Sequence, residues 1–238
     1  MNSFHFPDQK PTFKEKFFQL VGKYKHGFLL LYMLIYFPWF HYLETTVTTR
    51  YHVIHMALDD KIPFIEYFIV PYLLWFVYVA GAVLYFLFCN KDEYFRLCAF
   101  LFTGMTVFLV ISTIYPNGHH LRPVTFAHDN IFVDMVRRLY ATDTPTNLFP
   151  SIHVYNSIGV NIAVWHSSNF RNNRKVRYGS AVLMVLIILS TMFLKQHSVF
   201  DVITGIVFAL FMYTVVYARS SVRINESESS LEERVRSV

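Results

Sequence analysis

Two histidines, an aspartate and an arginine are the residues of this chain whose types and spacing could perform chemistry. His197 and Asp201 are four residues apart, so on a helix they share a face and Asp201 can accept a hydrogen bond from one ring nitrogen of His197. Such a bond would fix the tautomer and leave the other nitrogen as a nucleophile or a base. A polar pair that stabilises the end of a membrane helix accounts for the same spacing, and the pair alone favours neither interpretation.

The string Pro150-Ser151-Ile152-His153 has the composition of a helix start. Proline favours the first turn of a helix, and the residues that follow it would present free amides, which bind anions. Ser151 adds a hydroxyl, and His153 could act as a general acid. Taken alone, the string is better explained as a simple helix start with a histidine at the membrane interface.

Two cations are further candidates for binding phosphate. Arg122 precedes Pro123 in a predicted loop, and the guanidinium fork matches the geometry of phosphate. A solvated loop arginine is the simpler interpretation of this residue alone. Lys195, two residues before His197, could bind phosphate or place its ammonium at the membrane surface.

Composition indicates that these residues belong to a membrane protein. The chain has 238 residues, of which 54% are hydrophobic and 16% are charged, whereas soluble domains carry about 25% charged residues. Six predominantly apolar runs approach the roughly 20 residues that cross a bilayer. These runs are Gly27–Leu43, Phe68–Phe88, Leu97–Tyr115, Ile152–His166, Tyr178–Leu194 and Val199–Ala218. The fourth run also carries polar residues, so we expect it to be buried in a helix bundle rather than exposed to lipid.

The positions of the lysines and arginines predict how the chain crosses the membrane. Of the 21, fifteen fall in the segments on one side of the six runs and six on the other, and the richer side is the cytoplasmic one. Both termini are therefore predicted to be cytoplasmic, and the clusters at Arg122, Ser151 and His197 meet at the extracytoplasmic face. The net charge of +5 follows from this bias, so the basic composition does not call for a nucleic-acid partner.

The predicted fold class is an all-α integral membrane protein with six transmembrane helices. We expect one membrane catalytic domain, residues 1–224, and a polar cytoplasmic tail, residues 225–238. Interleaved aromatic residues and lysines predict a surface helix within Met1–Lys25. Apolar residues at helical spacing predict a second one within Asn130–Tyr140, in the longest external loop.

The order and spacing of the clusters resemble the motifs of the type-2 phosphatidic acid phosphatase superfamily of membrane phosphatases and phosphotransferases. The first motif of that family is Lys, six residues, then Arg-Pro; Arg122-Pro123 match it, and Tyr115 stands at the lysine position. The second motif is Pro-Ser-Gly-His, which the string from Pro150 to His153 matches with Ile152 in place of glycine.

The third motif of the family is Ser-Arg, five residues, His, three residues, Asp. Ser190, His197 and Asp201 match it, and Thr191 stands at the arginine position. Two cations of the family are therefore replaced in this chain, at Tyr115 and at Thr191. Lys195 lies in the same segment and is a candidate to replace one of them.

The resemblance implies a role for each matched residue. His197 would become phosphorylated, Asp201 would orient it, and His153 would protonate the leaving alcohol. The candidate phosphate-binding residues are Arg122, Ser151, Ile152, Lys195, Tyr115 and Ser190. The implied mechanism uses no metal and no cofactor, and the implied partner is a lipid phosphate in the bilayer.

Two related reactions and one unrelated function follow as expectations. The first is hydrolysis of a lipid phosphate at the extracytoplasmic face, with a bacterial plasma membrane as the location that the resemblance favours. The second is headgroup transfer, because a less cationic site suits a less charged phosphate, and because Phe149-Pro150-Ser151-Ile152-His153 is similar to the Phe-Pro-Ser-Leu-His of inositol phosphorylceramide synthases. The third is a transporter on the same fold; the near absence of charges in the spans outside the active-face cluster argues against it. The sequence names neither the lipid nor the oligomeric state.

Overall fold

The computed structural model describes residues 12–218. The predicted polar tail at 225–238 and the cytoplasmic placement of the two termini lie outside the described residues. The longer helices are α1 (Phe13–Lys23), α2 (Met33–Thr46), α3 (Ile69–Cys89), α4 (Lys91–Ile114), α5 (Ile131–Thr142), α6 (Ile152–His166), α7 (Arg174–Phe193) and α8 (Val199–Tyr213). Shorter helical turns are η1 (Lys25–Tyr32), η2 (Asp59–Lys61), η3 (Glu66–Phe68), η4 (Ser168–Phe170) and the π-helical η5 (Thr214–Ala218).

Four helical segments are long and apolar enough to cross a membrane. They are Glu66–Cys89, Lys91–Ile114, Arg174–Phe193 and Val199–Ala218, and they contain or overlap the second, third, fifth and sixth predicted runs. The first predicted run lies in η1 and α2, which follow one another directly, and the fourth is the 15-residue α6. The membrane character of the bundle is therefore supported, and the count of six spans remains a prediction.

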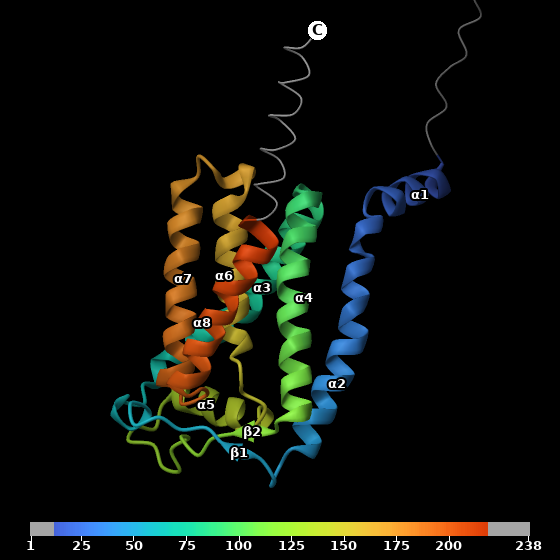
Figure 1. Ribbon diagram of the computed structural model, residues 1–238. Helices are drawn as coiled ribbons and strands as arrows, with labels where there is room; N and C mark the ends of the chain where they lie inside the picture. The colour runs from blue at the N-terminus through green and yellow to red at the C-terminus, as the bar shows by residue number, and fades with distance from the viewer. Residues whose placement is uncertain (1–11, 219–238) are drawn as a thin grey trace, which may run out of the picture.

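The bundle is built around α6. This helix packs against α3, α4, α7 and α8, and Figure 1 shows it among these helices while η1 and α2 run alongside α4. Asn156 and Ser157 of α6 are both buried. The expectation that this polar segment lies inside a bundle is thereby confirmed for these two residues.

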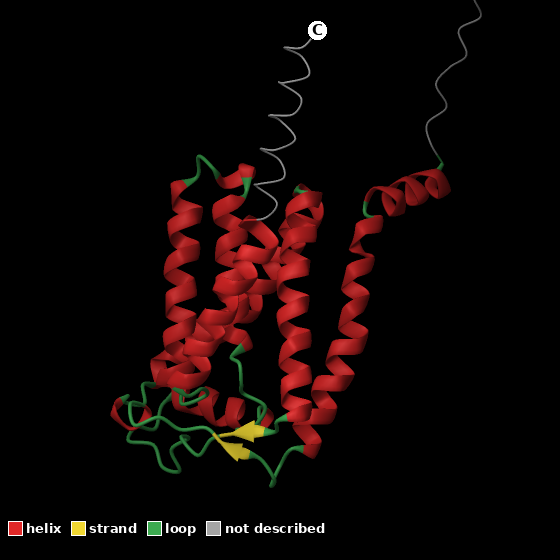
Figure 2. Ribbon diagram, in the orientation of Figure 1, coloured by secondary structure: helices red, strands yellow, loops and turns green. Residues whose placement is uncertain are grey.

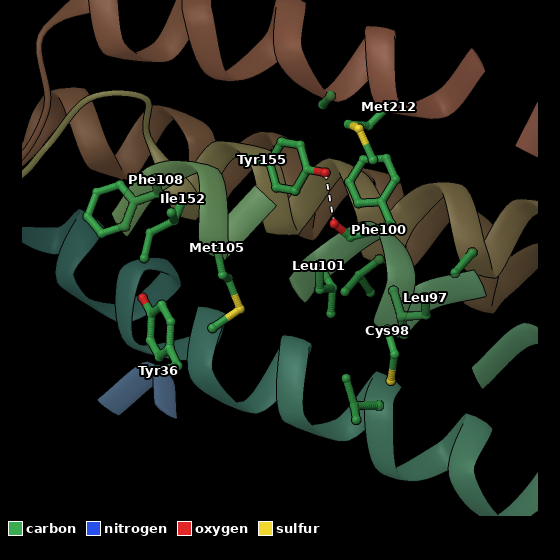
Figure 3. Packing of buried hydrophobic residues seen from close by; sticks show 14 of the residues in the cluster. Tyr36, Leu97, Cys98, Phe100, Leu101, Met105, Phe108, Ile152, Tyr155 and Met212 are labelled. Atoms are coloured by element: carbon green, nitrogen blue, oxygen red, sulfur yellow. Dashed lines mark hydrogen bonds between the residues drawn. The ribbon is translucent and has the colours of Figure 1, made fainter. Parts of the chain in front are cut away.

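Close approach of α4 and α6 depends on two glycines. A Cβ on Gly104 of α4 would overlap the ring of Tyr155, and one on Gly159 of α6 would lie 2.5 Å from the ring of Phe100. Between these glycines the Tyr155 and Phe100 rings stack at 4.6 Å, and the Tyr155 hydroxyl donates a 2.8 Å hydrogen bond to the Phe100 carbonyl. Figure 3 shows this pair within the buried apolar cluster. Both glycines therefore permit the close packing of α4 against α6.

One end of the bundle carries the loops in which the candidate site lies. The short parallel strands β1 (His52–Val53) and β2 (Asn117–Gly118) pair there. Figure 2 shows both strands and most of the loop residues at this end, with α1 at the opposite end. The predicted surface helix of the long external loop is α5, and Figure 1 places it beside the strands.

Polar residues set where several of these helices begin. Asn130 accepts hydrogen bonds from the amides of Phe132 and Val133 at the start of α5. Ser198 and Asp201 form a capping box at the start of α8. The Asp201 carboxylate accepts from the Ser198 amide, and the Ser198 hydroxyl accepts from the Phe200 amide. Ser151 caps α6 by accepting from the amide of Val154. The starts of α6 and α8 are thus determined by residues that also belong to the predicted chemical clusters.

Substituting Gly104 tests the packing of α4 against α6. We expect Gly104→Ala to lower the free energy of unfolding by about 1–3 kcal/mol, because the new methyl group overlaps a buried ring that cannot move freely. The measurement is thermal unfolding of the purified protein in detergent. Gly81→Ala in α3 is the matched control, since nothing lies within 4 Å of its added Cβ. Equal midpoints for the two variants would contradict this account of the interface.

Candidate active site

The first turns of α6 and α8 meet at the loop-bearing end of the bundle. The amide of Ser151 donates to the carbonyl of Asp201 at 3.3 Å. A Cβ on Gly205 would lie 3.0 Å from the Ser151 carbonyl, so a larger residue there would push the two helix starts apart. Two positive helix ends therefore lie side by side, and the first amides of α6 have no acceptor within their own helix.

His153 and His197 are in direct contact. Nδ1 of His153 lies 3.3 Å from Nε2 of His197, although the residues are 44 positions apart in the sequence. His197 is only 5% exposed. His153 also packs against Tyr72 and Trp75 of α3, with ring centroids 4.8 and 4.3 Å away. The structure thus brings the second and third sequence clusters together.

Asp201 lies behind His197. Oδ2 of Asp201 is 3.5 Å from Nδ1 of His197, and the same oxygen accepts from the Ser198 amide at 3.0 Å. The carboxylate therefore caps α8 and lies next to the imidazole, although Nδ1 of His197 has no hydrogen-bond partner. The Asp201 carboxylate favours a proton on Nδ1 of His197. Nε2 of His197 then carries the lone pair, so Nδ1 of His153 is the donor in the contact between the two rings.

The electrostatic surroundings keep His197 neutral. Burial lowers the pKa of His197 to about 3, and the nearby positive charge of Arg122 lowers it further in the same direction. An imidazole that remains unprotonated near neutral pH retains the lone pair that a nucleophile needs. Arg122, from the first sequence cluster, is hydrogen-bonded to Gln196, the residue directly before His197.

The guanidinium of Arg122 is surrounded by acceptors. Nη1 donates to the carbonyls of Asp143 and Tyr140 at 2.7 and 3.4 Å. Nη2 donates to the Thr144 carbonyl at 3.1 Å and to Oε1 of Gln196 at 2.5 Å. The ring of Tyr140 lies 4.5 Å from the guanidinium carbon. Arg122 therefore holds the loop after α5 against the residue that precedes His197, and only Nε lacks a partner.

Glu44, at the end of α2, holds the same loop from its other side. One carboxylate oxygen accepts from the amide and hydroxyl of Thr144 at 3.1 and 2.5 Å. The other accepts from the side-chain amide of Asn147 at 3.0 Å. Asn147 has φ of 55°, in the left-handed region, so the loop reverses sharply just before the start of α6. Sequence analysis missed Glu44, because nothing in the sequence links it to residues 100 positions away.

Two further residues anchor the segments of the site. Oδ1 of Asn117 accepts from the amides of Leu148 and Phe149 at 2.8 and 2.9 Å. The ring of His119 accepts from the Leu121 amide and, through its other nitrogen, donates to the carbonyl of Gln196 at 2.9 Å. Burial lowers the pKa of His119 to about 4, so the ring is neutral near pH 7. His119 lies in the predicted loop before Arg122, and the structure shows it buried.

The chain has a recognisable family relationship that agrees with this geometry. Residues 121–224 match the sequence profile of the PAP2 superfamily. This segment is therefore similar to the PAP2 superfamily. No curated protein and no solved structure gives a significant match. The match begins one residue before Arg122, so the arginine, His153, His197 and Asp201 all lie within the PAP2 segment.

The PAP2 relationship and the apolar helices together support a membrane protein with phosphatase or phosphotransferase activity. Members of this superfamily are generally phosphoric ester hydrolases. Residues outside the matched segment nevertheless contribute to the site, since Glu44 holds its loop and α3 supplies the rings against His153. The first half of the chain is therefore part of the structure that positions the PAP2 residues.

Tyr115, at one of the two replaced cation positions, and Lys195, the candidate replacement, both have other partners in the structure. Tyr115 is 45% exposed, and its ring stacks on His52 at 4.2 Å. The Lys195 ammonium donates to the carbonyls of Asp59 and Ile62 at 2.7 and 2.5 Å. Lys195 thus holds the first external loop, and its predicted role in binding phosphate gains no support from this geometry.

The remaining predicted phosphate ligands differ in how they are engaged. The Ser190 hydroxyl is buried and donates to the Ile187 carbonyl within α7, so its proton is used. The hydroxyl of Ser151 accepts from an amide and keeps its own proton available. Ile152 is nine-tenths buried, and its backbone amide opens α6. Of these three, Ser151 retains a hydroxyl proton and Ile152 stands at the start of a helix.

Asp59 is a buried carboxylate that ties the first external loop to α8. It accepts from the Ser198 hydroxyl at 2.6 Å and from the Val199 amide at 2.8 Å. Negative charge at a helix start is stabilising. The sequence did not reveal that this carboxylate reaches the segment that carries His197.

Removing the Glu44 carboxylate tests whether it holds the loop before α6. We expect Glu44→Ala to lower the free energy of unfolding by about 1–3 kcal/mol, because partly buried donors on Thr144 and Asn147 lose their acceptor. Hydrogen–deuterium exchange should rise over residues 144–151. The control is Asp134→Ala, which removes a carboxylate from an exposed ion pair with Arg137 and should cost at most about 1 kcal/mol. Unchanged exchange in the Glu44 variant would contradict this role.

Proposed function

We propose that this protein is a metal-independent lipid phosphatase that hydrolyses a phosphate ester through a phosphohistidine at His197. The observation that carries the proposal is the contact between the Nε2 of His197 and His153, with Asp201 behind the first ring. A neutral nucleophile, a general acid and an arginine are the parts that phosphoryl transfer needs. The PAP2 match to this segment supports the same chemistry.

In the first step, Nε2 of His197 attacks phosphorus and the bond from phosphorus to the lipid oxygen breaks. His153, which takes up a proton when the anionic phosphate binds beside it, gives that proton to the departing oxygen and becomes neutral. The positive charge that develops on the phosphorylated ring is stabilised by Asp201. In the second step, water attacks phosphorus, His153 takes up a water proton, and phosphate leaves His197 in its original form.

This sequence requires the two imidazoles to separate. An attacking nitrogen stands about 3–3.5 Å from phosphorus, and a general acid stands about 2.6–3.2 Å from the oxygen it protonates. An in-line arrangement therefore cannot fit between nitrogens that are 3.3 Å apart. The entering phosphate replaces the hydrogen bond that His153 donates to the lone pair of His197. The leaving oxygen of the lipid then lies next to His153.

The phosphoryl oxygens are held by the positive groups gathered at this end of the bundle. Arg122 supplies the charge, and the first amides of α6 with the Ser151 hydroxyl supply donors at a helix start. Binding at the headgroup level of an extracytoplasmic leaflet, as the charge distribution of the loops favours, would let a lipid enter from the bilayer. The proposed location of the protein is a bacterial plasma membrane.

A lipid phosphotransferase is the second candidate. Thr191 and Tyr115 replace two family cations, and a site with fewer cations suits a phosphodiester, which carries less charge than a monoester. The first chemical step is shared, and only the acceptor of the second step differs. A lipid or sugar hydroxyl would then replace water.

Replacing His197 distinguishes these reactions from a protein without catalytic activity. Wild type should release phosphate from at least one member of a panel of lipid monoesters, and His197→Ala should reduce turnover by more than about 10⁴-fold, because the covalent intermediate cannot form. New headgroup lipids formed without free phosphate would establish the phosphotransferase instead. His166→Ala is the control, since His166 is exposed at the far end of α6. Activity of His197→Ala within a few-fold of wild type would refute the nucleophile.

A further inference from the structure

The side chain of Gln196, directly before His197, is buried and only partly used. The residue is 1% exposed. Its backbone amide donates to the Thr191 carbonyl at 2.9 Å, and its own carbonyl accepts from His119 at 2.9 Å. Its side-chain oxygen accepts from Arg122 at 2.5 Å, whereas its side-chain nitrogen, Nε2, has no partner. Buried polar groups in folded proteins are almost always paired, so this nitrogen indicates a missing acceptor.

The orientation of the Gln196 amide follows from its neighbour. A guanidinium has donors and no acceptor, so the atom that faces Nη2 of Arg122 must be the amide oxygen. Rotating the amide by half a turn would place two donors against each other. The unpartnered atom is therefore a true N–H donor.

A second unpartnered donor lies on the same edge of the Arg122 guanidinium. Four of its five N–H groups have acceptors at Tyr140, Asp143, Thr144 and Gln196, and the fifth, on Nε, has none. Nε and Nη2 share one edge of the planar group. The two free donors are Nε2 of Gln196 and Nε of Arg122, and they lie on either side of the hydrogen bond between these two residues. Two donors in this arrangement, one of them on a cation, suit an anionic oxygen.

The turn before His197 brings Gln196 back over Thr191, the residue that stands where the PAP2 motif has arginine. Lys195 has φ of 52°, a left-handed conformation that reverses the chain. As a result, the amides of both Gln196 and His197 donate to the Thr191 carbonyl, at 2.9 and 3.1 Å. The ammonium of Lys195, bound to Asp59 and Ile62, fastens this turn. Gln196 is therefore placed close to the position of the missing cation.

We propose that Nε2 of Gln196 binds a nonbridging oxygen of the phosphoryl group that His197 receives, together with Nε of Arg122. This inference rests on the function proposed above. A neutral amide then takes the place of the arginine replaced by Thr191, and the site matches a phosphoryl group with about one negative charge. Gln196, rather than Lys195, compensates for the departure from the family motif.

Gln196→Glu tests this role, because the variant keeps the shape of the side chain and an oxygen for Arg122 while it removes the donor. A residue that only holds Arg122 would work as well with glutamate, since a carboxylate accepts more strongly from a guanidinium. A residue that donates to phosphate would not. We expect kcat/KM to fall by about 10²- to 10³-fold, the usual loss for one donor to a reacting oxyanion, with the thermal midpoint unchanged. Activity within threefold of wild type would overturn the proposal.

Binding of orthovanadate, which mimics a transferring phosphoryl group, supplies a readout that does not depend on turnover. Vanadate should raise the thermal midpoint of wild type, and this shift should be lost in Gln196→Glu and reduced in Gln196→Met, which removes the donor without adding charge. A full vanadate shift in both variants would overturn the role of Gln196 and leave the proposed function intact. The absence of any shift and of any phosphate release in wild type would instead refute the proposed function.

Discussion

The guanidinium of Arg122 is largely buried, since only 12% of the side chain is exposed. A buried charge needs hydrogen-bond acceptors around it. Three of its acceptors are backbone carbonyls of residues 140–144 and the fourth is the side chain of Gln196. Because Tyr140 lies in the last turn of α5, the guanidinium also faces the negative end of that helix. One residue thus joins α5, the loop that leads to α6 and the segment that carries His197.

The remaining interactions of this end of the bundle hold the same segments from other directions. Glu44 holds the loop at Thr144 and Asn147, and Asp59 holds the start of α8 through Ser198. Both carboxylates come from the first 60 residues, outside the PAP2 segment. The candidate catalytic residues therefore lie in the second half of the chain, while their positioning depends on contacts from both halves. This division explains why a family match to residues 121–224 is sufficient to indicate a reaction class and insufficient to describe the site.

Much of this arrangement could be predicted from the sequence. Apolar runs and helical spacing located the long helices and α5, and the motif residues His153 and His197 do meet. What the sequence could not show is which polar side chains are used internally. Lys195 and Gln196 are adjacent, yet a left-handed turn sends the lysine to loop carbonyls and the glutamine to Arg122. Charge favoured the lysine as the phosphate ligand, whereas tertiary hydrogen bonding leaves the neutral amide free. Glu44 and Asp59 were missed for the same reason, since their partners lie 100 or more positions away.

The central claim, that His197 carries the phosphoryl group, is tested most directly by trapping the intermediate. The enzyme is mixed with a lipid substrate labelled in its phosphate, denatured rapidly in alkali, digested and analysed by mass spectrometry. The account predicts an acid-labile, alkali-stable phosphate on the peptide that contains His197, and no such label in His197→Ala. A label on another residue, or continued turnover in the variant, would contradict it.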